Sequence, residues 1–201
     1  MSEQMSTTTR DRLVTAVAEL MRVHGYSAVT VKQITAAAGA PMGSLYHHFP
    51  QGKVQIAAEA LRSTGAVYIQ LLPLLMDPHE DLRVAVPAVF DDAARTLEES
   101  EWMNMCPVGT VAGEIADSEP ALREVAAEVM RDWIDQGATY FGNRGVAESA
   151  ARELILAMLS ALEGAFILGR TLRSAEPLRA AGRAMAARVE NVLAEGAAVD
   201  R

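Results

Sequence analysis

The sequence lacks several features that would place it in a large functional class. It has one cysteine, Cys106, so an intramolecular disulfide framework is excluded, and this fits a reducing compartment. No apolar run approaches the length that spans a bilayer, and the first residues, MSEQMSTTTRDR, have neither the basic nor the apolar segment of a secretory signal. We therefore expect a cytoplasmic protein without a membrane partner.

Catalytic motifs are also missing. The sequence has no glycine-rich phosphate loop, nucleophile elbow, HExxH motif or pair of carboxylates at catalytic spacing, and the acidic stretch GEIADSE has no such spacing either. The side chains of His47 and His48 point about 100° apart on a helix, while His24 and His79 lack cysteine or acidic partners at ligand spacing. We predict no enzymatic activity, metal site or cofactor.

Basic residues are few, and they are unevenly distributed. Residues 1–62 contain six Lys/Arg and four Asp/Glu, a balance of +2, whereas the remaining residues have a balance of −10. An N-terminal segment of this kind can approach a polyanion that the acidic remainder repels. The split indicates two segments with different functions.

Composition and periodicity predict an all-α protein. Alanine, leucine, glutamate and arginine dominate, while β-branched clusters and alternating patterns are scarce. Pro87 falls inside a helical pattern and predicts a kink or a break there. The expected helices cover residues 8–24, 31–38, 42–49, 53–76, 80–100, 119–142, 148–173 and 176–196, with a short helical piece near 107–116.

Residues 30–49 have the pattern of two short helices joined by a tight turn. Thr30 and Gln33 form a Thr-x-x-Gln capping box, Gly39 ends the helix that this box begins, and Pro41 precedes the next helix. Two such helices make a helix-turn-helix, which places its second helix in a DNA major groove.

The second of these helices, MGSLYHHF, has one face suited to close approach. Leu45 and Phe49 point toward the first two helices, while the small or hydrogen-bonding residues point away and suit contact with base edges. Phosphate contacts suit the residues at the edges of this face. They also suit the threonine that caps the preceding helix and the lysine at the start of the following one. The predicted DNA-binding residues are Thr30, Pro41, Met42, Gly43, Ser44, Tyr46, His47, His48 and Lys53.

On these residues the sequence resembles the tetracycline-repressor (TetR) family of bacterial transcriptional regulators. The similarity runs through GYSAVTVKQITAAAGAPMGSLYHHFPQGKVQIAAEAL, with Tyr46, Phe49 and Lys53 on recurring family positions. FPQGK and the later CPVGTVAGEIADSEPALREVAAEVMRDW resemble the LmrA/YxaF-like branch. Thr35 replaces the usual alanine, so packing there is either looser or gains a hydroxyl bond. Met42 stands where the branch often has a polar or basic residue, which leaves the base preference there open.

The resemblance implies a DNA-binding domain over residues 1–54 and a ligand-binding and dimerisation domain over 55–201. It implies a homodimeric repressor that binds a pseudo-palindromic operator in double-stranded DNA and is released by a small hydrophobic effector. An activator of the same fold and a helical dimerisation module without a DNA role remain alternatives.

Small residues among apolar ones mark a candidate dimer interface in the last two predicted helices. They let helices approach closely, as in a four-helix bundle formed by two subunits, although packing within one chain explains them as well. The candidate interface residues are Leu154, Ala161, Leu162, Ala165, Ala184 and Ala187.

Methionine and aromatic residues mark a candidate effector pocket, or else an ordinary core. Glu163 suits a polar or cationic ligand group, or a buried partner such as an arginine across the dimer. Cys106 suits a structural thiol better than a redox sensor, because no second cysteine is present to pair with it. The candidate pocket residues are Phe90, Trp102, Met103, Met105, Cys106, Met130, Trp133, Phe141, Met158, Glu163 and Phe166.

Overall fold

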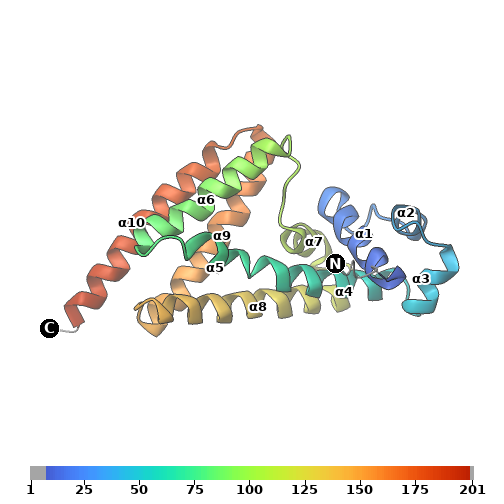
Figure 1. The fold of residues 1–201 in the computed structure, drawn as a ribbon, viewed down its shortest axis with the longest axis horizontal. Coiled ribbons are helices and arrows are strands. Elements are labelled where there is room, and N and C mark those ends of the chain that lie inside the picture. The colour runs from blue at the N-terminus through green and yellow to red at the C-terminus, as the bar shows by residue number, and fades with distance from the viewer. Residues whose placement is uncertain (1–7, 200–201) are drawn as a thin grey trace, which may run out of the picture. The chain divides into compact units, whose positions relative to one another are not determined.

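The computed structural model describes residues 8–199, and within that range the chain consists of helices and their connections, without a strand (Figure 1). The all-α prediction is therefore confirmed. The helices are α1 (Thr9–His24), α2 (Val31–Ala37), α3 (Met42–His48), α4 (Lys53–Tyr68), α5 (Leu71–Met76), α6 (Leu82–Glu99), α7 (Pro107–Ile115), α8 (Pro120–Asn143), α9 (Glu148–Leu172) and α10 (Glu176–Val199).

The helix predicted over residues 53–76 is divided into α4 and α5, so the prediction of one continuous helix was wrong. Pro73 has no N–H to donate to the carbonyl of Ile69, and its ring would clash with that carbonyl in an unbroken α-helix. The Ile69 carbonyl instead accepts a hydrogen bond from the N–H of Leu72 at 3.2 Å, which makes a tighter turn.

Pro87 does not break the helix in which it lies. α6 continues through it from Leu82 to Glu99. The proline costs α6 the hydrogen bond to the carbonyl of Arg83, but its neighbours Val86 and Phe90 are fully buried. Apolar burial on both sides of the proline therefore keeps the helix in place.

The chain divides into two compact units. Unit 1 comprises residues up to 65 together with 106–129, and unit 2 comprises residues 66–105 and those from 130 onward. The boundary between the units runs inside α4 and inside α8, whereas we had expected a single boundary at residue 54. The DNA-binding role of residues 1–54 is a separate statement about function, and these boundaries do not test it.

Unit 1 packs α1, α2 and α3 around one apolar core, and α7 lies against α1. The α7 side chains Val108, Val111 and Ile115 are fully buried. Each of the other helices contributes one apolar face, as helical spacing requires. The largest buried side chains on α1 to α4 and their connections are Leu13, Met21, Ile34, Leu45, Phe49, Ile56 and Leu61.

Unit 2 is built around α6, which α10 follows along its length, with α5 and α9 as further neighbours (Figure 1). α10 approaches α6 closely at Gly182. A side-chain carbon added there would lie only 2.9 Å from Cβ of Phe90. A second close approach occurs where a carbon added at Gly169 of α9 would lie 2.7 Å from Leu97. These glycines allow tight packing between the helices.

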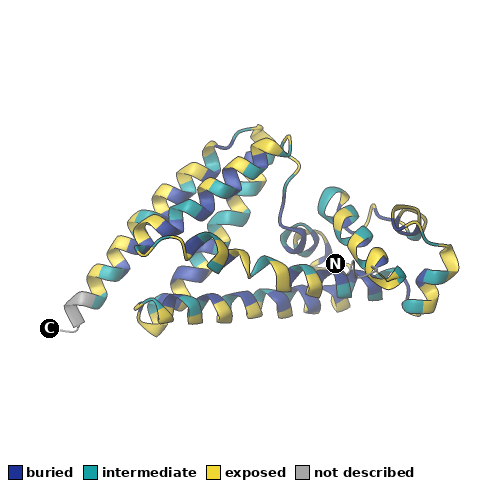
Figure 2. Ribbon diagram, in the orientation of Figure 1, coloured by how far each residue is buried: buried dark blue, intermediate teal, exposed yellow. Residues whose placement is uncertain are grey.

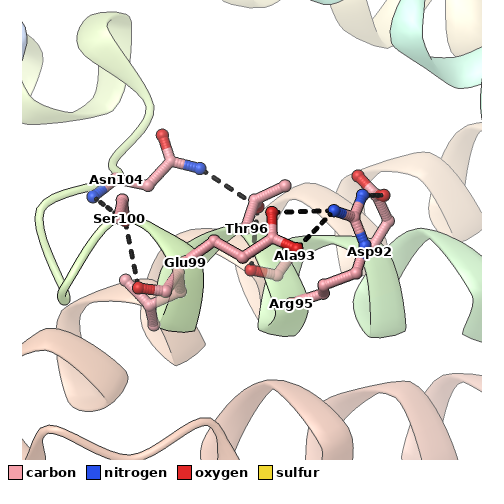
Figure 3. A network of polar contacts seen from close by, with 8 residues as sticks. Asp92, Ala93, Arg95, Thr96, Glu99, Ser100 and Asn104 are labelled. Atoms are coloured by element: carbon pink, nitrogen blue, oxygen red, sulfur yellow. Dashed lines mark hydrogen bonds and ion pairs between the residues drawn. The ribbon is translucent and has the colours of Figure 1, made fainter.

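Polar contacts hold the turn that follows α6 (Figure 3). Asn104 donates from Nδ2 to Oγ1 of Thr96 at 3.2 Å, and its N–H donates to Oγ of Ser100 at 2.9 Å. Within this turn Glu101 and Trp102 have φ values of 52° and 68°. Residues other than glycine adopt this left-handed conformation at a cost of about 1–2 kcal/mol each. The Asn104 contacts therefore stabilise a strained turn.

α9 departs from one expectation about membranes. We expected no apolar segment of membrane-spanning length, but α9 is long and apolar enough by length and composition, with a window of mean hydropathy 1.5. Only 28% of that window is buried. Its exposed large apolar residues are Leu156, Ile167, Leu168 and Leu172. Figure 2 shows how buried and exposed residues are distributed over the helices. One helix of this kind does not indicate a membrane protein.

The contact between α4 and α8 in unit 1 depends on Gly65. A side-chain carbon added there would overlap Cγ1 of Val129 and lie 3.2 Å from Cγ2. Both residues are buried. We expect Gly65→Ala to lower the free energy of unfolding by about 1–3 kcal/mol in urea denaturation, because overpacking outweighs the better helix propensity of alanine.

A double-mutant cycle checks this cause. Val129→Ala in the Gly65→Ala background should recover part of the lost stability, since it removes the overlapping methyl groups. Gly142→Ala is the control, because a carbon added at Gly142 meets nothing within 4 Å. An unchanged or raised stability for Gly65→Ala would show that α4 and α8 can move apart at no cost.

Candidate nucleic-acid interface

The turn between α2 and α3 is fixed by a pair of backbone hydrogen bonds. The N–H of Gly39 donates to the carbonyl of Ala36 at 3.2 Å, and the N–H of Ala40 donates to the carbonyl of Thr35 at 2.9 Å. This is a Schellman motif, and Gly39 supplies its left-handed residue at φ 58°. The motif ends α2 and sets the direction in which α3 leaves.

α2 begins and packs as the sequence predicts. The Thr30 hydroxyl accepts from the N–H of Gln33 at 3.3 Å, and Oε1 of Gln33 accepts from the N–H of Thr30 at 2.8 Å, which completes the capping box. Thr35 is buried, and its hydroxyl donates to the carbonyls of Val31 and Lys32. Of the two possibilities stated for Thr35, the structure shows the added hydroxyl bond.

α3 has one buried side and one exposed side (Figure 2). Leu45 and Phe49 are fully buried, whereas Met42 and Tyr46 are 48% and 51% exposed. A side-chain carbon added at Gly43 meets nothing within 4 Å, so the fold does not need a glycine there. Among the other predicted contacts, Pro41 and His47 are exposed, and Ser44 and His48 are half-buried.

The Lys53 side chain is not freely exposed, as a simple phosphate contact would be, but packs against an aromatic ring. Its Nζ is 4.0 Å from the centre of the Tyr26 ring, a cation–π distance. Burial lowers the pKa of Lys53 below its ordinary value, although the charges of Glu114 and Glu119 oppose that effect. Lys53 is thus held by unit 1 itself, in a partly desolvated position at the start of α4.

Two arginines of α1 tie the helix-turn-helix together. Arg10 pairs with Glu59 of α4, and its guanidinium lies 5.4 Å from the centre of the Phe49 ring. Arg12 donates from Nε to the carbonyl of Ala38 at 3.1 Å, at the end of α2. α1 therefore contacts the C-terminal end of α2 and the C-terminal end of α3.

One residue that contacts the segment before the helix-turn-helix was not among the predicted functional residues. Glu114, near the end of α7, accepts hydrogen bonds from the N–H groups of Tyr26 and Ser27, which follow α1. In the sequence this carboxylate lies within GEIADSE, a stretch without catalytic spacing. No local pattern connects positions 87 and 88 residues apart, so the contact needed the folded structure.

Two family models match this sequence. The model for "Bacterial regulatory proteins, tetR family" matches residues 13–60, and the model for "Transcriptional regulator LmrA/YxaF-like, C-terminal domain" matches residues 83–184. The chain belongs to the TetR family, in its LmrA/YxaF-like branch. It is therefore a transcriptional regulator with a DNA-binding N-terminal domain, not an enzyme. The resemblance drawn from Tyr46, Phe49 and Lys53 is confirmed.

Relatives of this TetR-family regulator support the assignment along most of the chain. The HTH-type transcriptional regulator YxaF of Bacillus subtilis (strain 168) is 32% identical, over 84% of this chain and 88% of its own. LmrA of the same strain is 29% identical, over 84% and 90%. The crystal structure of a TetR regulator from Chloroflexus aurantiacus J-10-FL is 28% identical with a TM-score of 0.73, over 90% and 94%.

Five candidate pocket residues of this TetR regulator belong to the core of unit 2. Phe90, Phe141 and Met158 are buried in one cluster, and Trp102 and Phe166 pack against it half-buried. Such positions are those of ordinary core side chains. Of the other candidates, Met105, Cys106 and Trp133 are buried, Met130 and Glu163 are half-buried, and Met103 is exposed.

Cys106 begins α7. Its Sγ accepts a hydrogen bond from the N–H of Gly109 at 3.3 Å, as the cap of the helix, and the side chain is buried. This position supports the structural interpretation of the thiol.

Unit 2 also has an open groove between α5 and α8, of about 440 Å³, which none of the predicted pocket residues lines. Apolar side chains form much of one wall, and polar side chains of α8 form the other. The lining residues are Ile69, Gln70, Leu72, Pro73, Asp135, Gln136, Thr139, Tyr140 and Asn143.

The candidate dimer residues fall on both sides of their helices. Leu154 and Ala165 are buried in the core of unit 2, so within one chain they have almost no surface to offer a partner. Ala161 and Leu162 are half-buried, while Ala184 and Ala187 are exposed on α10. The exposed large apolar residues of α9 are Leu156, Ile167, Leu168 and Leu172.

Proposed function

We propose that this regulator is a dimeric repressor whose α3 enters the major groove at each half of a pseudo-palindromic operator. The observation that supports this most strongly is Gly43. It lies in the first turn of α3, on the exposed side, and a side-chain carbon added there meets nothing within 4 Å in the described residues 8–199. A glycine that the fold does not need is explained by a partner that comes close to the backbone.

The proposed contacts divide into base contacts and phosphate contacts. Ser44 and His47 offer hydrogen-bonding groups to base edges, and Met42 offers an apolar contact to a thymine methyl group. A second set of residues is proposed to contact the DNA backbone, which sets the register without specifying sequence. These residues are Thr30, Pro41, Tyr46, His48 and Lys53.

The proposed dimer interface is the exposed face of α9 together with that of α10. Leu156, Ile167 and Leu168 share one side of α9 with Ser160 and Thr171. The two hydroxyls donate to carbonyls of α9 itself at 2.8 Å, so they need no partner outside the helix. The half-buried Glu163 lies beside Leu156 at the edge of this side, as helical spacing requires.

α10 extends the proposed interface with small side chains. Ala180, Ala184 and Ala187 are exposed at helical spacing, and α10 packs beside α9. Exposed apolar and small residues on two adjacent helices suit a second copy of the chain, which can complete a four-helix bundle about a two-fold axis. Family members typically dimerise, which supports the same assignment.

We propose that a small, largely apolar effector binds unit 2 and weakens operator binding. An effector does so by binding more tightly to a conformation in which the two copies of α3 do not match the half-sites. The groove between α5 and α8 fits such a ligand in size, since ligand sites usually enclose about 300–1,000 Å³ and combine apolar walls with a few polar groups. The candidates outside the core cluster, Met103, Met130 and Glu163 among them, remain proposals.

Fluorescence anisotropy with DNA from upstream of the regulator's own gene tests the DNA-binding proposal. We expect a specific complex whose affinity falls steeply as salt rises, because basic side chains displace counterions from phosphates. Unrelated duplex DNA of equal length is the control. A dimeric protein that binds both duplexes equally weakly would contradict the proposal.

A reporter gene behind the same DNA separates repression from activation. A repressor lowers expression, and an effector restores it, whereas an activator of the same fold does the reverse. Thermal-shift screening of small apolar compounds is the matching test for an effector, since a ligand that binds the folded state raises the melting temperature.

A further inference from the structure

Glu114 binds the connection between α1 and α2 with both of its carboxylate oxygens. The N–H of Tyr26 donates to Oε2 at 2.6 Å, and the N–H of Ser27 donates to Oε1 at 2.7 Å. Consecutive N–H groups aimed at one anion form a concave site of the kind that binds phosphates in other proteins. Here a carboxylate from α7, in the same unit, occupies it.

Gly25 permits this contact in two ways. It ends α1 with a φ of 76°, which favours glycine. A side-chain carbon added there would also overlap Oε2 of Glu114. Any larger residue would push the carboxylate away from the N–H groups of Tyr26 and Ser27. The backbone after α1 is therefore shaped around the Glu114 carboxylate.

Glu114 stabilises the α1–α2 connection rather than its own helix, α7. A negative charge in the last turn of a helix opposes the helix dipole, so Glu114 does not stabilise α7 by its position. Its favourable interactions are those with the other segment. Partial burial raises the pKa of the Glu114 carboxyl, but the hydrogen bonds from Ser27 and Tyr26 and the charge of Lys53 outweigh it and lower the pKa.

Tyr26 links the Glu114 contact to the connection between α3 and α4. Its ring is almost fully buried and lies against the Lys53 ammonium, at the start of α4. Phe49, the buried residue that ends α3, lies four residues before Lys53. Glu114 thus holds the connection that precedes α2 and, through Tyr26, contacts the connection that follows α3.

We propose that Glu114 is a positioning residue for DNA recognition. Its carboxylate fixes the α1–α2 connection, so that α2 and α3 meet the major groove in one orientation. Glu114 does not contact DNA in this proposal, and it acts through Tyr26 and Ser27. The effect on DNA rests on the proposed function, whereas the hydrogen bonds themselves can be measured without DNA.

The sign of the effect distinguishes positioning from simple electrostatics. Removing a negative charge from a protein favours its binding to polyanionic DNA, if charge is all that matters. Glu114→Gln removes the charge and replaces one acceptor oxygen with a donor, so the side chain can no longer accept from both N–H groups in the same way. Positioning therefore predicts weaker binding, and electrostatics alone predicts equal or tighter binding.

The test uses the full chain and fluorescein-labelled DNA from upstream of its own gene. We expect Glu114→Gln to raise the Kd about tenfold, the size of one lost charge-assisted hydrogen bond. Asp117→Asn is the control, because it removes one negative charge from the segment that follows α7, whereas the N–H groups of Tyr26 and Ser27 donate to Glu114. This variant should bind as the wild type does, or more tightly.

Amide hydrogen exchange measured by NMR gives a second readout without DNA. The N–H groups of Tyr26 and Ser27 should exchange faster in Glu114→Gln than in the wild type, while those inside α1 should not change. In Glu114→Ala, formate substituted for chloride at constant ionic strength should restore part of the protection and of the DNA affinity, because it supplies the missing carboxylate.

Two results would overturn the proposal. One is DNA binding by Glu114→Gln that equals or exceeds that of the wild type; the other is unchanged exchange at Tyr26 and Ser27. If Glu114→Gln is unfolded at the assay temperature, Glu114→Asp replaces it, since it keeps the charge but shortens the reach and should also weaken binding. A wild type that binds no DNA refutes the proposed function instead, and the exchange rates then decide the contact by themselves.

Discussion

Gly43→Glu is expected to abolish specific DNA binding while leaving the protein at least as stable as the wild type. Gly43 lies in the first turn of α3, and a side-chain carbon added there meets nothing within 4 Å. The free protein can therefore accommodate the new side chain. A negative charge in the first turn also suits the helix dipole, and glycine is a poor helix former by about 0.5–1 kcal/mol.

The same substitution is strongly unfavourable in a complex with DNA. It places a carboxylate and two further carbons between the α3 backbone and the floor of the major groove. We expect the operator Kd to rise at least about 100-fold, or roughly 2.7 kcal/mol, in fluorescence anisotropy. Urea denaturation of the same sample should show an unchanged or higher free energy of unfolding.

Alanine substitutions provide the matched comparison. Gly43→Ala and Gly142→Ala each add one carbon in open space on a helix, and both should raise stability slightly. Only Gly43→Ala should weaken DNA binding. Full affinity in Gly43→Glu would mean that this side of α3 does not face the groove, and the assignment of α3 as the recognition helix would fail.

Ile167→Glu is expected to convert the dimer into monomers and to reduce operator affinity at least about 100-fold. Ile167 is 57% exposed on α9, on the side that also carries the exposed Leu156 and Leu168. In an interface with two-fold symmetry each substitution occurs twice, and an unpaired buried charge costs about 3–5 kcal/mol. Losing the dimer also removes the gain from binding two half-sites at once. Sedimentation velocity and anisotropy measure the two effects.

Val84→Glu is the control for this change. Val84 is 52% exposed on α6, so the substitution alters a similar apolar surface outside the proposed interface. It should remain dimeric and bind DNA normally. A dimer that survives both Ile167→Glu and Leu168→Glu would place the interface on another face of the chain.

The helices were predictable from the sequence because their signals are local. The capping box of Thr30 and Gln33, the glycine at 39 and the buried pair Leu45 and Phe49 each depend on residues a few positions apart, and the structure shows all of them. The division of α4 from α5 was missed even though its cause, Pro73, is local. The apolar pattern on both sides of Pro73 continues in helical register, and it therefore predicted one continuous helix in spite of the proline.

The contacts that surround α3 were not predictable, because they join distant positions. Lys53 stays a proposed phosphate contact, but local spacing did not predict that its ammonium lies 4.0 Å from the centre of the Tyr26 ring. Glu114 was set aside with its acidic neighbours, and its partners are far away in the sequence. Helical spacing puts Leu154 and Leu156 on opposite sides of α9 but does not say which side is buried; the structure shows Leu154 buried and Leu156 exposed.

The division of unit 1 into two separate stretches of sequence has a consequence for exchanging parts between relatives. Residues up to 65 depend on residues 106–129, which supply α7 and the first part of α8. A chimera that transfers only the first 65 residues to another regulator would leave Tyr26 and Ser27 facing a foreign side chain, and Gly65 facing a foreign α8. We therefore expect unit 1 of this chain to keep its stability in a chimera only when both segments are grafted together.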